Sequence, residues 1–497
     1  MSKVIIIGSG LGGLTCGYIL LKNGYDVTIL EQGGQIGGCL QCFYRKGAKF
    51  ETGMHFIGSA LPGQTMDLLI HYFGLADSVR LSPLDTNGYN TVAIDGEQFT
   101  FPNGRDEFIE KMSQYFPHQR DSLKKYMEII ERISSASTLS SLTSEQRDLV
   151  AKTEYQTLSI NSVMDEIFQD ELLKKVLVGD LPLYSAELDK TPFTQHAYIM
   201  DFFNQSAFRI EGGSDAIAIS LADNIKRLGG NIETRKRVVR IKCNESKATG
   251  VETADENFYD ADYIISTIHP NRLMEMLDTK LIRPAFRHRI TSIPQTAGGF
   301  AVYLKFKDES MPYMNTNWYG YSNGTPWGCE YYTPDEWPKG FLYMHMCHQD
   351  RAQWAKSGVI LTYMNIEEVI QWQGLPIGHR GEDYEKFKRE RALKLIAEVE
   401  KHHPGLRASI ESYYTSTPLT YVDYTGTERG SMYGVAKDIS MGAAGRVPYR
   451  TKIPNLLLAG QNVNSHGMLG VIVGTIVTCS ELVDAEKIYG EIKERAI

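Results

Sequence analysis

The chain has 497 residues, of which 42% are hydrophobic and 23% are charged, and its formal net charge is −8. This composition is ordinary for a globular protein, and the length predicts roughly two to four structural units. The acidic balance argues against a nucleic-acid partner, because nucleic-acid-binding surfaces are usually basic.

The first residues, MSKVIIIGSG, lack the basic segment and the long apolar segment of a secretory signal peptide. No run of about 18 apolar residues is present, so the sequence predicts no membrane-spanning helix. The seven cysteines are scattered along the chain, which favours a reducing compartment over a disulfide framework. We therefore expect a cytoplasmic protein and leave peripheral membrane contact open.

Cys39 and Cys42 form a CxxC pair. Zinc is not expected there, since no second pair and no histidine cluster lie nearby, and no other metal site is predicted. A redox dithiol is one interpretation of this pair. The favoured interpretation is two small residues in a cofactor-binding loop.

The N-terminal segment predicts a nucleotide-binding βαβ unit. Lys3–Ile7 is a β-branched run typical of a buried parallel strand, Leu14–Asn23 is a predicted helix, and Asp26–Leu30 is a predicted second strand. Gly24 follows the helix as a C-terminal cap.

A GxGxxG motif, Gly8-Ser9-Gly10-Leu11-Gly12-Gly13, joins the first strand to the helix. Gly8 permits the tight turn, Gly10 lets the backbone approach a pyrophosphate, and Gly13 lets helix and strand pack closely. The helix N-terminus stabilises the phosphate charge. The motif, with Leu11 and Gly12 in the same turn, therefore predicts a dinucleotide site.

Glu31 and Gln32 follow the second strand. A carboxylate at this position accepts hydrogen bonds from the adenosine ribose, which FAD and NAD share. A second glycine cluster, which ends in Gly37 and Gly38, comes directly afterwards. It favours FAD, because a simple NAD dehydrogenase would continue with a third strand or a helix.

In the middle of the chain the sequence pattern changes to longer amphipathic helices, and alternating strands and helices then resume. No second glycine-rich phosphate loop is found, so no dedicated NAD(P) site is expected. The predicted helices are Glu107–Phe116, Gln119–Ala136, Ser144–Lys152, Ser162–Val178, Ser214–Leu228 and Met468–Tyr489, and the predicted strands are Arg237–Lys242, Gly250–Thr253, Tyr263–Thr267 and Asn455–Leu458.

Several blocks resemble the phytoene desaturase-like FAD oxidoreductases, a superfamily of carotenoid desaturases, carotenoid isomerases and retinol saturases. They stand in that superfamily's order and span most of the chain. Animal retinol saturases carry an N-terminal leader that this sequence lacks, which favours a bacterial member. The blocks are EQGGQIGGCLQCFYRKGAKFETGMHFIG from Glu31, TPLT from Thr417, RGSMYG from Arg429 and RTKIPNLLLAGQ from Arg450.

The resemblance implies an α/β fold with a Rossmann-type, glutathione reductase-like FAD-binding domain and an inserted mixed α+β substrate domain. Residues 1–75, 206–285 and 442–497 would form the discontinuous FAD-binding domain, and residues 76–205 and 286–441 the substrate-binding domain.

The resemblance also implies further FAD contacts. Gly460 and Gln461 would lie near the phosphate and ribityl chain, Val238 and Val239 would hold the adenine through their backbone, and residues 467–471, including Gly470 and Val471, would face the isoalloxazine ring.

The implied reaction is hydride transfer between flavin N5 and a carbon of a lipophilic polyene, as a reductase, a desaturase or an isomerase. His55 is the first candidate for the proton donor, and His466 is the second. The electron donor or acceptor would be a separate, diffusing partner.

Two sets of apolar residues suggest a substrate tunnel and a membrane-facing stretch. Aromatic and methionine residues of the middle segments could line an elongated apolar tunnel, although each taken alone is expected to belong to the core. The stretch from Met66 to Leu75 could lie on a membrane, although packing in the core is favoured for it. The aromatic and methionine set is Phe193, Tyr198, Met200, Phe202, Phe203, Met311, Tyr313, Trp318, Tyr319, Tyr321, Tyr343 and Met344.

Two other classes of protein fit the same motifs. A flavin-containing amine oxidase shares the layout, but the position of Cys479 inside the last predicted helix argues against covalent FAD. A non-catalytic FAD-binding protein is the second alternative.

Overall fold

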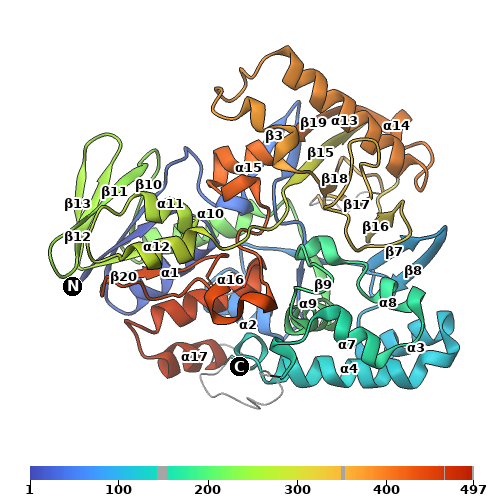
Figure 1. Cartoon of the computed structure of the whole chain (residues 1–497), viewed down its shortest axis with the longest axis horizontal. Coiled ribbons are helices and arrows are strands. Elements are labelled where there is room, and N and C mark those ends of the chain that lie inside the picture. The colour runs from blue at the N-terminus through green and yellow to red at the C-terminus, as the bar shows by residue number, and fades with distance from the viewer. Residues whose placement is uncertain (143–153, 349–352, 464, 495–497) are drawn as a thin grey trace.

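A parallel sheet built from segments far apart in the chain forms one half of the molecule (Figure 1). The computed structural model describes residues 1–142, 154–348, 353–463 and 465–494. Within these residues the five strands are all parallel, and the predicted βαβ unit supplies the two central ones. Their order is β10 (Asn231–Glu233), β2 (Asp26–Leu30), β1 (Lys3–Ile7), β14 (Tyr263–Ser266) and β20 (Leu456–Leu458).

Helix α1 (Leu11–Lys22) contacts both α10 (Asp215–Arg227) and α16 (Gly467–Cys479). The predicted C-terminal helix from Met468 to Tyr489 is wrong as a single element, because α17 (Ala485–Glu494) follows after a break. Asp484 Oδ1 accepts the Glu486 N–H at 3.1 Å, and this bond restarts the helix.

The other half of the molecule is built on a seven-stranded sheet, as counted among the described residues. Its strands are mostly antiparallel, and β16 pairs with β7 in parallel. Their order is β19 (Ile410–Ser416), β15 (Gly299–Phe306), β18 (Ser357–Tyr363), β17 (Gly340–His345), β16 (Asn317–Tyr321), β7 (Asn90–Ile94) and β8 (Glu97–Phe101).

Helices from the middle of the chain pack beside this sheet (Figure 1). The single predicted helix Ser162–Val178 is wrong, since Asp170 accepts two backbone N–H bonds and starts a new helix there. The predicted helix Ser144–Lys152 lies outside the described residues. The helices of this half are α3 (Arg105–Tyr115), α4 (Arg120–Ser135), α5 (Thr138–Ser141), α7 (Ile160–Ile167), α8 (Glu171–Leu177), α9 (Phe193–Gln205), α13 (Glu382–Glu400), α14 (Leu406–Ser409) and α15 (Pro418–Thr425).

Short strands connect the two halves. Strand β9 (Ala207–Ile210) pairs with β5 (Ile57–Gly58) and with β6 (Leu81–Pro83), while β3 (Cys42–Arg45) pairs with β4 (Ala48–Glu51). The remaining elements are α2 (Thr65–Tyr72), β11 (Val238–Cys243), β12 (Ala248–Thr253), β13 (Phe258–Asp260), α11 (Pro270–Glu275) and α12 (Pro284–Thr291).

The larger sheets draw on different parts of the sequence. The parallel sheet takes strands from residues 1–75, 206–285 and 442–497, and the seven-stranded sheet takes strands from residues 76–205 and 286–441. The exact domain boundaries stay a prediction.

Helix α2 lies in the protein core and does not present its apolar face to the outside. Met66, Leu69 and Ile70 are buried, as are Phe73 and Leu75 beyond the helix end. The membrane interpretation of this stretch is therefore wrong, and its core interpretation holds. No helix of the described residues combines the length and apolarity that a membrane crossing needs.

Gly13 is the position at which α1 and β1 approach most closely. A Cβ added to Gly13 would lie 1.9 Å from the Gly8 carbonyl oxygen, so Gly13→Ala must push the helix off the strand. We expect it to destabilise the fold by about 1–3 kcal/mol or more in urea unfolding followed by circular dichroism. Gly490→Ala in α17 is the matched control, because its Cβ would meet nothing within 4 Å. Equal stability of the two variants would contradict this close packing.

Candidate functional site

A cavity of about 380 Å³ is lined by residues of both halves. Its wall includes backbone from the GxGxxG turn, from the second glycine cluster and from the start of α16. Most of the residues predicted from the sequence line it: Gly8, Gly10, Leu11, Gly12, Glu31, Gln32, Gly37, Gly38, His55, Gly460, Gln461, His466, Gly470 and Val471.

The GxGxxG turn has the geometry that a bound pyrophosphate requires. Gly8 has φ +99°, which favours glycine, and a Cβ on Gly10 would meet no atom within 4 Å. The second glycine cluster lies against the turn, since the Gly37 N–H donates to the Ser9 carbonyl at 3.0 Å. Helix α1 starts directly after Gly10, so its free N–H groups lie at the cavity.

Glu31 has a structural role that the sequence did not reveal. Its Oε2 accepts hydrogen bonds from the Ser9 N–H at 2.9 Å and from the Ser9 hydroxyl at 2.6 Å. Its Oε1 accepts the Gly33 N–H at 2.7 Å. The carboxylate therefore ties both glycine loops together. It also lines the cavity and retains acceptor capacity for a ribose hydroxyl.

The start of α16 lies at the cavity, and its two glycines differ in role. A Cβ on Gly467 would meet nothing within 4 Å, whereas one on Gly470 would lie 2.5 Å from the Ser465 Cβ. Gly470 is thus needed for packing against Ser465. Gly12 and Gly460 likewise permit a close contact, because a Cβ on Gly12 would be 3.0 Å from the Gly460 Cα.

Val239 lies outside the cavity wall, while its neighbour Val238 lines the cavity. Val239 is 38% exposed and Val238 is buried, as expected for adjacent residues of a strand. Of the two residues expected at the adenine, Val238 therefore faces the cavity, and the sequence alone did not identify this inward face of β11.

His466 is the N-cap residue of α16 and stacks on Tyr433 at a ring-centroid distance of 4.6 Å. Burial, together with the nearby charge of Lys437, lowers the pKa of His466 to about 3. The imidazole is therefore neutral near pH 7, and its buried Nε2 has no hydrogen-bond partner among the described residues. This environment suits a hydrogen bond to a ligand better than proton donation.

Cys39 and Cys42 have different surroundings. Cys39 lines the cavity, whereas the Cys42 sulfur lies 3.8 Å from the Ser214 hydroxyl on the other side of the loop, and both thiols are free. Burial raises the pKa of both thiols, that of Cys42 to about 12. Cys479 is buried against Cys16 in the core, away from the cavity wall.

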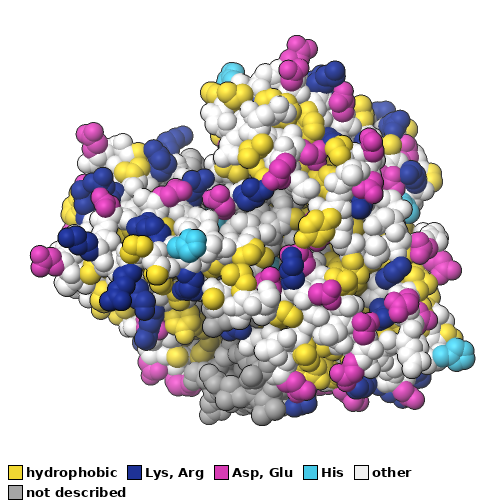
Figure 2. Space-filling model, in the orientation of Figure 1, with side chains coloured by type: hydrophobic (Ala, Val, Ile, Leu, Met, Phe, Trp, Pro, Cys, Tyr) yellow, Lys and Arg dark blue, Asp and Glu magenta, His cyan; other side chains and the backbone are white. Residues whose placement is uncertain are grey.

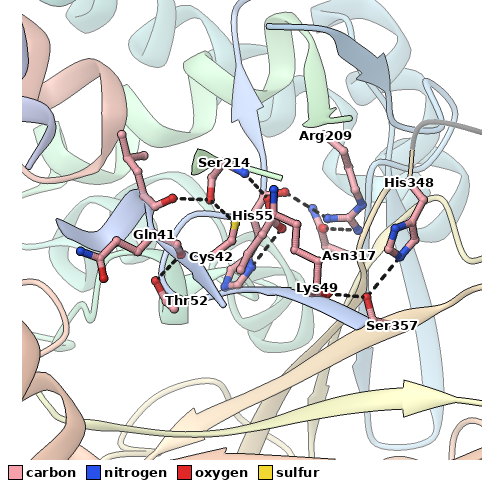
Figure 3. Close-up of polar contacts among 12 residues, drawn as sticks. Gln41, Cys42, Lys49, Thr52, His55, Arg209, Ser214, Asn317, His348 and Ser357 are labelled. Carbon is pink, nitrogen blue, oxygen red and sulfur yellow. Dashed lines mark hydrogen bonds and ion pairs between the residues drawn. The ribbon is translucent and has the colours of Figure 1, made fainter. Parts of the chain in front are cut away.

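His55 stands at the meeting point of the two halves (Figure 3). Its side chain is 11% exposed, and its Nδ1 lies 3.5 Å from Glu51 Oε2. Glu51 Oε1 also accepts the Ser214 N–H at 2.9 Å, at the start of α10. Arg209 of the neighbouring strand β9 donates to the His55 carbonyl at 3.5 Å.

The apolar part of the wall comes from two helices and from strands of the seven-stranded sheet, which contribute Ala301, Leu342, Val359 and Leu361. In α9 the lining residues Gln195, Tyr198, Ile199 and Phe202 follow helical spacing, and Tyr421, Tyr424 and Thr425 do the same in α15. Tyr198, Phe202 and Phe203 were among the aromatic candidates. The α15 residues and Tyr433 were missed, although their spacing is visible in the sequence. The other candidates belong to the core or pack against it: Phe193, Met200, Met311, Tyr313, Trp318, Tyr319, Tyr321, Tyr343 and Met344.

The cavity fits an extended dinucleotide better than a metal ion. Open space in front of Gly10 and Gly467, two helix N-termini and the unpartnered His466 Nε2 are features of a ligand cradle. Among the described residues, no group of three or more His, Cys, Asp or Glu side chains could hold a metal.

The comparisons with known proteins agree with this geometry. Residues 11–476 match the family model of flavin-containing amine oxidoreductases. All-trans-retinol 13,14-reductase of Rattus norvegicus is 26% identical, over 98% of this chain and 86% of that protein. The 1-hydroxycarotenoid 3,4-desaturase of a Flavobacterium species is 22% identical, over 94% of this chain and 96% of that protein.

Solved structures agree on the fold. The crystal structure of an oxidoreductase from Methanosarcina mazei has a TM-score of 0.66 and 17% identity, and the match covers 96% of this chain and all of that one. The resemblance to the phytoene desaturase-like superfamily and the α/β FAD-binding fold are both confirmed. The chain belongs to the flavin-containing amine oxidoreductases and is an FAD-dependent oxidoreductase.

Proposed function

We propose that this oxidoreductase acts on carbon–carbon double bonds of a lipophilic polyene of the retinoid or carotenoid kind. The observation that carries the proposal is one continuous cavity, with a glycine-lined dinucleotide end and an apolar end lined by α9 and α15. His55 lines the same cavity. The names of the retinol reductase and carotenoid desaturase relatives support this substrate class.

Bound FAD would supply hydride transfer at its N5. Gly8, Gly10 and the N-terminus of α1 would hold its pyrophosphate, and Glu31 its adenosine ribose. Val238 would lie at the adenine, and the start of α16, with Gly467, would lie at the flavin ring. A positive helix end there would stabilise a reduced, anionic flavin.

His55 would move the proton that accompanies the hydride. In reduction one alkene carbon receives the hydride and the other receives a proton, and in desaturation both leave. His55 fits this role better than His466, because burial keeps His466 neutral. The apolar wall would exclude water from the reacting carbons.

The electron donor or acceptor would be a separate molecule. The sequence contains one GxGxxG motif, and no second one that could hold a nicotinamide dinucleotide in its own Rossmann fold. A diffusing partner, such as a quinone, oxygen or another reductase, would therefore exchange electrons with the flavin.

A lipophilic substrate can be delivered from a membrane, and an exposed apolar patch lies in a segment that is tied to a helix of the cavity wall. The patch consists of Ile370, Leu375 and Ile377 in the segment before α13, and Figure 2 shows hydrophobic side chains over this segment at the top of the view. The Arg380–Asp423 ion pair of 2.6 Å ties the segment to α15, whose exposed Tyr424 lines the cavity. This continuity supports peripheral contact with a bilayer.

Glu31→Ala tests the FAD assignment. The variant loses three hydrogen bonds that join the glycine loops, so we expect FAD to dissociate about 10- to 100-fold more readily. Flavin absorbance after gel filtration and FAD titration of the apoprotein measure this. Glu245→Ala, at an exposed position, is the control. Unchanged FAD affinity in Glu31→Ala would mean that Glu31 does not contribute to FAD binding.

Anaerobic incubation with reduced and with oxidised flavin tests the substrate class. Retinoids, carotenoids and primary amines are offered, and the products are analysed by mass spectrometry. We expect a two-hydrogen mass change or an isomer from a polyene, and a turnover on the order of 10²–10⁴-fold lower in His55→Gln. Amine oxidation alone would favour an amine oxidase, and no reaction with any compound would favour a non-catalytic FAD-binding protein. Either result rejects the proposal.

Liposome flotation tests the membrane patch. The wild-type protein should float with vesicles. The triple variant Ile370→Ser, Leu375→Ser, Ile377→Ser should stay at the bottom, because it loses the exposed apolar area. A double Ser variant of the exposed Ile219 and Phe258 is the control and should float. If the wild-type protein does not float, the proposed membrane contact fails.

A further inference from the structure

A buried carboxylate lies directly behind His55. Glu51 ends strand β4, and its side chain is 5% exposed. A second, very small cavity of about 10 Å³ is lined by Glu51, His55 and Arg209. This volume accommodates a water molecule at most, so no ligand binds there. The interaction between Glu51 and His55 is therefore shielded from bulk solvent.

The negative charge of Glu51 is stabilised at the start of a helix. Glu51 Oε1 accepts the Ser214 N–H at the start of α10, where the helix dipole favours a negative charge. Arg209, which is 1% exposed, lines the same small cavity.

The other histidine in the small cavity cannot take the place of His55. The Met314 N–H donates to His345 Nδ1 at 2.9 Å, which leaves the proton of His345 on Nε2, beside the Tyr343 hydroxyl. Burial, with help from the charges of Arg209 and His403, lowers the pKa of His345 to about 3. His345 therefore stays neutral and in one tautomer.

We propose that Glu51 is the positioning residue of His55: it holds a proton on Nδ1 and thereby leaves Nε2 as the nitrogen that serves the large cavity. A carboxylate has acceptors alone, so the ring nitrogen that faces it must carry the proton. The Nδ1–Oε2 distance of 3.5 Å is long for a hydrogen bond, and such contacts commonly shorten when substrate binds.

The chemical role of Glu51 rests on the proposed function, in which His55 moves the proton. In the reducing direction, bound FAD would supply the hydride for one new C–H bond. The π electron pair of the alkene forms the second with the proton that leaves His55 Nε2. His55 is then neutral, with its remaining proton on Nδ1 facing Glu51. In the desaturating direction the same nitrogen accepts the proton, and Glu51 stabilises the imidazolium that forms.

Glu51→Gln is the decisive variant. The Ser214 N–H requires an acceptor, so the amide oxygen takes the Oε1 position and the contact with α10 is kept. The amide NH₂ then faces His55 Nδ1 and donates to it, which moves the proton of neutral His55 to Nε2. Glu51→Asp keeps a carboxylate at greater distance and should keep the Nδ1–H tautomer.

The tautomer is measured by two-bond ¹H–¹⁵N correlation spectra of ¹⁵N-histidine-labelled protein with oxidised FAD and no substrate. His55→Gln identifies the His55 signal among the twelve histidines. We expect Nδ1–H in the wild type and in Glu51→Asp, and Nε2–H in Glu51→Gln. Asp180→Asn is the matched control, since Asp180 is a buried carboxyl group outside the cavity wall, and it should leave the signal unchanged.

Kinetics supply the second measurement. With a polyene that the wild-type enzyme converts, Glu51→Gln should lower kcat by on the order of 10²-fold or more with little change in KM. Glu51→Asp should lower kcat less. The Nδ1–H tautomer in Glu51→Gln, or Nε2–H in the wild type, would overturn the proposal. Because the spectra need no substrate, they test Glu51 even if the polyene assay rejects the proposed function.

Discussion

The close contact between α1 and β1 is the constraint on which the rest of the structure depends. Gly13 has no side chain, so the helix lies against the Gly8 carbonyl and its N-terminus opens into the cavity. The contact between Gly12 and Gly460 then brings the C-terminal part of the chain to the same place. Two helix N-termini, those of α1 and α16, therefore meet at one ligand site and favour anionic groups of a dinucleotide.

Buried polar side chains, and not apolar packing alone, join the two halves of the molecule. Glu51 links β4 to α10, and Arg209 of β9 donates to the Thr316 carbonyl at 3.1 Å and to Asn317 Oδ1 at 2.9 Å. Buried charges are costly unless they are compensated, so this cluster specifies one arrangement of the connecting strands. His55 lies within it and lines the large cavity.

The apolar end of the cavity is built by helical spacing. Helix α9 presents Tyr198, Ile199 and Phe202 on one face, and α15 presents Tyr421 and Tyr424. These side chains form part of the wall of the cavity. A fold does not by itself fix the reaction, so the reaction depends on the polar side chains at the cavity and on the shape of this wall.

The sequence by itself determined the βαβ unit, the glycine turns and many of the residues that line the cavity, because strand periodicity, glycine freedom and helix starts depend on neighbouring residues. It could not reveal that the segment Ser162–Val178 forms two helices. The Asp170 side chain caps the second helix and interrupts the helix that the spacing of apolar residues predicts. The tertiary structure alone decided that Val238 faces inward, that Met66–Leu75 is core, and that Glu51 stands behind His55. Such facts depend on which elements pack together, and those elements are separated by long stretches of chain.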